Sequence, residues 1–176
     1  DVDSLSLDGV TWAFDQIGDS VFVSAPDGGW QPAGPQVVGL HYHGQPGKDP
    51  YWGGMYLTGD YIFSLGIGLT TIPPNHGKAW YPCFDQFRER SAYTYGITSA
   101  GGKRFHGQGH LVQTDSLGGD TIRRVFDMPQ PIPTYLSAIA VADYQDWDTT
   151  HVGTYGEVPI RLTAKAANLN LMKNRF

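Results

Sequence analysis

The sequence predicts an all-β fold, an antiparallel β-sandwich that ends in the start of a short C-terminal helix. The 176 residues include 23 glycines and 12 prolines, while 13% of the residues are aromatic and only 16% are charged. Runs rich in β-branched and aromatic residues recur along the chain, and turn residues separate them. This length suffices for one domain with its own hydrophobic core.

Eight segments show strand patterns, either apolar runs or alternation bounded by Gly, Pro or Asp. They are Val2–Leu7, Val21–Ala25, Val37–Tyr42, Tyr61–Leu65, Ser91–Thr98, Leu111–Thr114, Ile122–Phe126 and Tyr135–Val141. Glycine supplies the positive φ that hairpin turns need. Turns are therefore expected at Asp8-Gly9, Asp27-Gly28-Gly29, Gly53-Gly54, Gly101-Gly102 and Gly118-Gly119. Strands at this spacing favour antiparallel layers.

The last segment carries a helical pattern. Residues 164–176 contain no Gly or Pro, and Leu169, Met172, Lys173 and Phe176 share one helical face. We therefore divide the chain into a β-rich domain, residues 1–163, and a helical entry into a further domain, residues 164–176. A short helix that docks on the sheet is the alternative.

Charge and composition exclude several classes of function. The net charge is −5 and no Lys/Arg run occurs, so a nucleic-acid partner is not expected. Cys83 is the only cysteine, which excludes an intrachain disulfide and a cysteine-built zinc site. No apolar stretch is long enough to cross a bilayer. We expect a soluble protein; its compartment is undetermined, with a periplasmic or secreted parent left open.

No catalytic constellation and no metal site is evident. His-Glu-x-x-His and Gly-x-Ser-x-Gly are both absent. His41 and His43 would share one strand face, where we interpret them as surface residues. His106 and His110 have a helical spacing, but the glycines between them disfavour a helix. The acidic residues 143, 146 and 148 are interpreted as part of a solvated loop at a strand end.

The segment Trp80–Asp85 resembles the Phe-Pro-Cys-Phe/Trp-Asp signature in the N-terminal domain of aminopeptidase N-type zinc metallopeptidases. The order of later motifs is also similar. These motifs are Arg90-Ser91-Ala92-Tyr93, Gly109-His110-Leu111, Pro131-Ile132-Pro133-Thr134-Tyr135-Leu136 and Val141-Ala142-Asp143-Tyr144. Upstream, Gly54-Met55-Tyr56 and His41-Tyr42-His43-Gly44 resemble a hairpin and the strand end before it. The resemblance is specific over residues 54–145 and weaker over residues 1–53.

The resemblance implies a saddle-like, noncatalytic N-terminal domain. Such a domain caps a zinc-binding catalytic domain and forms part of the cleft for the peptide N-terminus. Zinc would belong to the parent enzyme beyond Phe176, so no cofactor is expected in this fragment. The implied partners are its own downstream catalytic domain and a peptide substrate. The residues that carry the structural motif are Trp80, Pro82, Cys83, Asp85, Thr134 and Tyr135.

One departure concerns the substrate's free amino group. In the family, an acidic or amide residue ten positions before the signature cysteine helps to hold that group, whereas position 73 is proline here. We expect Asn75 and His76 to substitute as substrate-binding residues. Two alternatives stay open. One is a standalone β-sandwich module that binds carbohydrate or protein, in which aromatic residues form a stacking platform; the other is an enzyme-dead scaffold relative.

Overall fold

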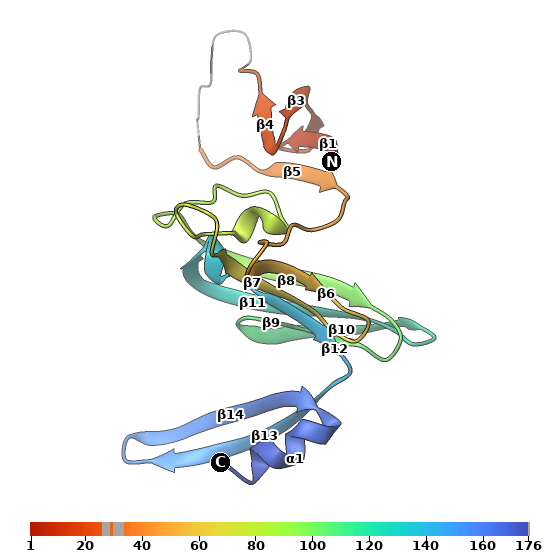
Figure 1. Cartoon of the computed structure of the whole chain (residues 1–176), viewed down its shortest axis with the longest axis vertical. Coiled ribbons are helices and arrows are strands. Elements are labelled where there is room, and N and C mark those ends of the chain that lie inside the picture. Colours follow the sequence, from red (N-terminus) through yellow and green to blue (C-terminus); the bar gives the residue numbers. More distant parts are fainter. Residues whose placement is uncertain (26–28, 30–33, 176) are drawn as a thin grey trace. The chain divides into compact units, whose positions relative to one another are not determined.

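The structure is a computed structural model that describes residues 1–25, 29 and 34–175 (Figure 1). The chain forms two compact units, Asp1–Pro46 and Gly47–Phe176. The described residues form fourteen strands, two short 3₁₀ helices and one α-helix. Every pairing between strands is antiparallel. The predicted all-β class is confirmed.

The first unit contains a three-stranded sheet, in the order β2-β1-β5, and a separate hairpin, β3–β4. The strands are β1 (Val2–Leu7), β2 (Val10–Thr11), β3 (Phe14–Ile17), β4 (Ser20–Val23) and β5 (Val38–Tyr42). Asp8 and Gly9 connect β1 to β2 with φ values of 48° and 82°. Positive φ at both turn residues is the geometry that Asp-Gly favours in a two-residue hairpin, so this turn forms as predicted.

The second unit contains a three-stranded sheet, a four-stranded sheet and a two-stranded ribbon. Its elements are β6 (Gly53–Leu57), β7 (Ile62–Gly68), η1 (Gly77–Ala79), β8 (Arg90–Ser99), β9 (Arg104–Gly107), β10 (His110–Gly118), β11 (Thr121–Pro133), η2 (Thr134–Leu136), β12 (Ile139–Ala142), β13 (Tyr144–Gly153), β14 (Gly156–Lys165) and α1 (Ala166–Lys173). The sheet orders are β10-β11-β8, β6-β7-β12-β9 and β13-β14.

The core of the second unit lies between its two larger sheets. Tyr95 and Phe126 come from the three-stranded sheet, whereas Met55 and Phe105 come from the four-stranded sheet, and all four belong to one buried cluster. Phe105 is completely buried. Two antiparallel sheets that share a core in this way form a β-sandwich.

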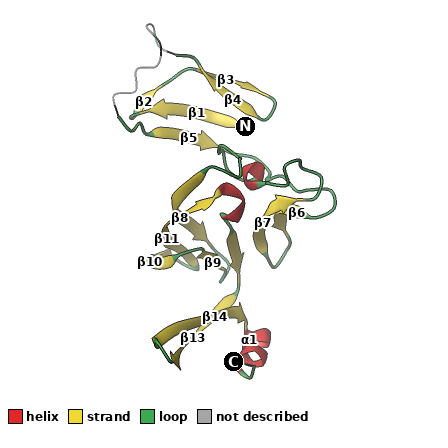
Figure 2. Cartoon of the chain, turned by 90° about the vertical axis from the view of Figure 1, so that its left-hand side faces the viewer, coloured by secondary structure: helices red, strands yellow, loops and turns green. Residues whose placement is uncertain are grey.

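The β13–β14 ribbon carries a second, smaller core. Leu162 and Ala164 of β14 pack with Leu169 of α1, and all three are buried. In Figure 2 the helix, in red, lies against one face of the ribbon. A two-stranded ribbon is marginally stable by itself, so the helix supplies the apolar cover that the ribbon needs.

Three predicted elements differ from the structure. The predicted strand Tyr135–Val141 begins instead as part of the 3₁₀ helix η2, because the Thr134 hydroxyl donates a hydrogen bond to Asp85. Strand β12 begins only at Ile139. The helix starts at Ala166, because Ala164 and Lys165 still pair with β13.

The third difference concerns Gly53-Gly54, which opens β6 and is not a turn. A Cβ at Gly53 would lie 1.6 Å from the carbonyl oxygen of Ile67, so glycine is needed there for the close approach of two strands. Gly101-Gly102 and Gly118-Gly119 have the expected positive φ. In the predicted turn Asp27-Gly28-Gly29, Asp27 and Gly28 lie outside the described residues.

Candidate functional site

The segment Trp80–Asp85 lies between η1 and β8 and is anchored by Asp85. One carboxylate oxygen of Asp85 accepts a hydrogen bond from the Thr134 hydroxyl at 2.7 Å. The other accepts the backbone N–H of Lys78 at 3.3 Å. Thr134 is buried. Asp85 therefore joins the loop before β8 to η2, which comes 49 residues later in the sequence.

Aromatic rings complete the anchor. The Tyr81 hydroxyl donates to the backbone oxygen of Thr134 at 3.2 Å and lies 3.2 Å from the Tyr93 hydroxyl. Trp80 and Tyr93 pack against the main core, and Phe87 meets the Tyr135 ring edge-on at 5.1 Å. These contacts join residues 80–87 to Thr134 and Tyr135.

Cys83 is half-buried. Burial, with a smaller contribution from the Asp85 charge, raises the pKa of its thiol to about 11. The thiolate is the nucleophilic form of cysteine. At neutral pH this side chain is therefore a protonated, weakly reactive thiol.

Asn75 and His76 lie beside this anchor. Asn75 is buried, and its side-chain amide donates to the backbone oxygen of Asp85. The backbone N–H of His76 donates to Gly66 at 2.6 Å. Both ring nitrogens of His76 are buried, and neither makes a hydrogen bond within the described residues. The structure therefore brings the two predicted residues to the signature segment, with Asn75 bonded to the scaffold and the His76 imidazole left without a polar partner there.

The carboxylate of Asp49 holds the loop before β6 and the loop after β7, and Asp49 is only 1% exposed. It accepts the backbone N–H groups of Tyr51 and Trp52 at 2.9 and 3.0 Å, and both the N–H and the hydroxyl of Thr70, at 2.8 and 2.6 Å. Burial alone would raise the pKa of Asp49, but these four hydrogen bonds outweigh it and hold the pKa far below its usual range. Asp49 therefore joins the loop of residues 49–52 to Thr70 in the loop of residues 69–72.

Of the first histidine pair, His41 lies in β5 and His43 immediately follows that strand. His43 contacts the Asp3 carboxylate at 2.9 Å, and both side chains are more than half exposed. Within residues 1–25, 29 and 34–175, no group of three His, Cys, Asp or Glu side chains is arranged to hold a metal ion. His106 and His110 lie on different strands, β9 and β10.

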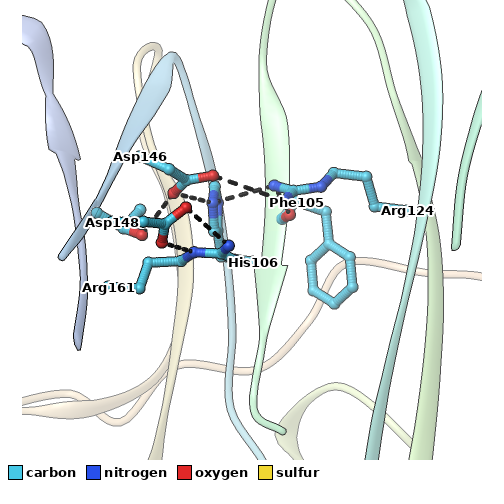
Figure 3. Close-up of polar contacts among 7 residues, drawn as sticks. Phe105, His106, Arg124, Asp146, Asp148 and Arg161 are labelled. Carbon is cyan, nitrogen blue, oxygen red and sulfur yellow. Dashed lines mark hydrogen bonds and ion pairs between the residues drawn. The ribbon is translucent and has the colours of Figure 1, made fainter. Parts of the chain in front are cut away.

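A polar cluster that the sequence did not predict joins the ribbon to the sandwich (Figure 3). We call it the Asp146 cluster; it consists of His106, Arg124, Asp146 and Thr163. Oδ1 of Asp146 lies 3.0 Å from Nε2 of His106 and accepts the Thr163 hydroxyl at 2.6 Å. Oδ2 lies 3.7 Å from the guanidinium of Arg124, whose side chain is 6% exposed.

Arg124 also has partners on the sandwich side of this cluster. Its Nη1 donates to the backbone oxygen of Phe105 at 2.8 Å and lies 3.0 Å from Nε2 of His106. Burial would raise the pKa of Asp146, but the Thr163 hydrogen bond and the charges of His106 and Arg124 lower it overall. These contacts join β9 and β11 of the sandwich to β13 and β14 of the ribbon.

The interpretation as a loop is wrong for Asp146 and Asp148, which lie in β13 (Tyr144–Gly153), whereas Asp143 lies in the bend between β12 and β13. A signal was present in the sequence. Asp146 and Asp148 alternate along β13, and they pair in register with Thr163 and Arg161 of β14. Opposite charges on facing strands stabilise such pairs, and Arg161 grips Asp148 with two hydrogen bonds of 2.6 and 3.0 Å.

Comparisons with known proteins support the fold. The sequence matches no protein-family model and no curated protein. The structure is similar to an M1 zinc metallopeptidase mutant from Deinococcus radiodurans bound to a Tyr-Ser-Ala substrate, with 19% identity and a TM-score of 0.79 over 94% of this chain and 38% of that chain. A two-domain M1 zinc metallopeptidase mutant bound to L-tryptophan gives 19% identity and a TM-score of 0.78 with the same coverage of both chains.

A third similar structure is Legionella pneumophila aminopeptidase A in complex with aspartic acid. Its identity is 15% and its TM-score 0.71, with 96% of this chain and 19% of that chain covered. The chain thus has the fold of one part of M1 zinc metallopeptidases, which confirms the resemblance at the level of fold. It spans well under half the length of each of these structures. No helix among the described residues is long and apolar enough to span a membrane.

Proposed function

We propose that this chain is the noncatalytic N-terminal domain of a zinc-dependent, aminopeptidase-like metallopeptidase. The observation that carries the proposal is the match of 94% of the chain to 38% of an M1 zinc metallopeptidase. A match to part of a longer enzyme is what a noncatalytic domain of such an enzyme would give. The remainder of the polypeptide would supply the catalytic domain.

The residues of this chain do not fit zinc. The sequence has no His-Glu-x-x-His, and the described residues offer no set of three metal-binding side chains. Protein zinc sites use three or four such ligands. In this proposal the zinc ligands and the general base therefore belong to the catalytic domain, which this chain caps.

We further propose that the loop containing Asn75 and His76 forms part of the cleft that receives the peptide N-terminus. The support is local. The imidazole nitrogens of His76 are buried without a hydrogen-bond partner in the described part of the chain, and buried polar groups normally have one. Asn75 fixes the loop through its bond to Asp85. His76 would thus present the polar group, and Asn75 would position it.

Substitution of Asn75 and His76 by alanine in the longer enzyme should raise KM for peptides with a free amino group by about tenfold, the range expected for a lost hydrogen bond to a charged group. The single change His76→Ala should give most of that increase, because it leaves the Asn75 anchor intact. The measurement is KM and kcat for a free and an N-acetylated peptide.

Gln86→Ala, at the exposed position that follows the segment Trp80–Asp85, is the matched control and should leave KM unchanged. If His76→Ala and the double variant retain the KM of the parent enzyme for free-amine peptides, the cleft role of this loop is refuted.

One observation favours the binding-module alternative. A concavity of about 240 Å³ is lined in part by Trp80, Tyr81, Tyr93 and Tyr95, of which Tyr95 is buried. Aromatic rings in a concave site are suited to stacking on a sugar. Titration of the 176-residue chain with soluble oligosaccharides separates the two functions. A domain that only caps an enzyme gives no saturable binding, whereas saturable binding that Tyr93→Ala abolishes would establish a carbohydrate module.

A periplasmic or secreted location of the parent is a further part of the proposal. The complete reading frame tests it, because a secretory signal peptide has a basic start followed by an apolar segment. A reading frame that starts without a signal peptide would contradict the proposed location and would leave the proposed function unaffected.

A further inference from the structure

The ribbon β13–β14 and helix α1 form an element with its own small core, separate from the core of the sandwich. Among the described residues, β13 and β14 pair only with each other. No backbone ladder therefore ties the ribbon to either larger sheet. Apart from the chain connection through Asp143, side chains make this attachment, and the Asp146 cluster is its most buried polar part.

The other ionic contact between ribbon and sandwich is more exposed. Lys165 lies 3.5 Å from Asp60, whose side chain is 77% exposed. Exposed ion pairs contribute little because water and salt screen them. In the Asp146 cluster, by contrast, the side chains of His106 and Arg124 are 14% and 6% exposed. The cluster is therefore the stronger attachment.

His106 occupies the centre of the cluster, between opposite charges. Its Nε2 lies 3.0 Å from the Asp146 carboxylate and 3.0 Å from the Arg124 guanidinium. The other nitrogen, Nδ1, is buried and makes no hydrogen bond of ordinary geometry within the described residues. With its proton on Nε2, neutral His106 donates to Asp146. A second proton would go on Nδ1, in a buried position, and would add a positive charge beside Arg124.

Other charged and aromatic groups lie near His106 and Arg124, on β9 and on the ribbon. Arg104 lies on the same strand, Tyr144 meets the ring edge-on at 5.3 Å, and Asp148 and Arg161 pair with each other on the ribbon. The charges of Arg104 and Arg161 both act on Arg124. Arg104 and Arg161 thus add positive charge near Arg124, and among the described residues Asp146 is the anion that contacts His106.

We propose that His106 is a pH-sensitive latch: its neutral form holds the ribbon on the sandwich, and its protonation releases the ribbon. The pKa of His106 is shifted downward, which is the direction that this proposal requires. Burial lowers it most, the Asp146 charge raises it, and Arg124 lowers it further, while the hydrogen bond to Asp146 and a weaker contact with the Arg104 backbone raise it, with a net decrease. Because the latched state binds a proton less readily than the released state, acid favours release. The ribbon is therefore attached most strongly above the ordinary histidine pKa of about 6.5, and its attachment weakens as the pH falls below that value.

Hydrogen exchange of the 176-residue chain, measured by mass spectrometry from pH 7.5 to 5.0, tests the latch. Each rate is divided by the intrinsic rate at that pH. Protection of peptides from residues 144–165 should fall by up to about tenfold for each pH unit below about 6.5. Protection of peptides from residues 122–128 in β11 should stay constant, because the sandwich does not open.

His106→Gln keeps a side-chain N–H donor for Asp146 and removes the titration, so the ribbon protection of this variant should be independent of pH over the same range. The control is His151→Gln, which removes an exposed histidine of the same ribbon and should keep the response of the parent chain. Ribbon protection that is constant with pH in the parent chain would refute the latch. So would a pH response that persists in His106→Gln, or one that is shared equally by ribbon and sandwich.

A second measurement tests the proposal even if His106→Gln fails to fold. Nuclear magnetic resonance of the imidazole nitrogens in the parent chain reports the tautomer and the titration of His106 directly. The latch requires a neutral Nε2-protonated ring at pH 7 and a pKa below 6.5. A pKa at or above 6.5 would overturn the proposal.

Discussion

Replacement of Phe105 by alanine is expected to lower the free energy of unfolding of the second unit by about 3–5 kcal/mol, the usual loss for a buried aromatic ring. Phe105 is completely buried. Its ring meets those of Tyr95 and Phe126 edge-on at 6.5 and 5.3 Å, and its backbone pairs with Val141 in β12. Removal of the ring therefore leaves a cavity where the two sheets meet.

Urea unfolding followed by circular dichroism measures this loss, and Phe84→Ala is the matched control. Phe84 is 84% exposed, so its loss should change the free energy of unfolding by less than about 0.5 kcal/mol. A loss below about 1 kcal/mol for Phe105→Ala would mean that the two sheets do not share the core described here.

Gly109→Ala is expected to cost at least about 2 kcal/mol of stability, because both its backbone conformation and its surroundings require glycine. Gly109 has φ of +85°, and an added Cβ would lie 2.0 Å from the carbonyl oxygen of Asp127. The obstacle is the backbone of β11, which cannot move without a shift of the sheet.

Gly101→Ala separates the cost of the backbone conformation from the cost of the steric clash. Gly101 has φ of +69°, but an added Cβ would meet no atom within 4 Å, so only the conformational cost of about 1 kcal/mol remains. Thermal unfolding of both variants provides the comparison. Equal losses at the two positions would show that the close approach of residue 109 to β11 is absent in solution.

Much of the fold was predictable from local patterns. Strand Val2–Leu7 and the Asp8-Gly9 turn follow from alternation and from the positive φ that Asp-Gly favours. Elements that depend on distant contacts were missed. η2 replaces the start of a predicted strand because Thr134 bonds to Asp85, 49 positions earlier in the sequence, and no local pattern shows that contact.

The Asp146 cluster was missed for a similar reason. His106 and Asp146 are 40 positions apart, and each alone has the sequence context of an ordinary surface residue. Only the pairing of β13 with β14, together with the attachment of the ribbon to β9 and β11, brings them together. The Trp80–Asp85 segment is recognisable in the sequence because its residues are contiguous, although its hydrogen bonds to Thr134 are not visible there.

We propose that this chain is the noncatalytic domain of a zinc peptidase, and the natural gene beyond the codon for Phe176 decides the question. A further domain with His-Glu-x-x-His, followed by another glutamate, is expected there. A stop codon at that point, or a downstream domain without this motif, would contradict it and leave a binding or scaffold role in its place.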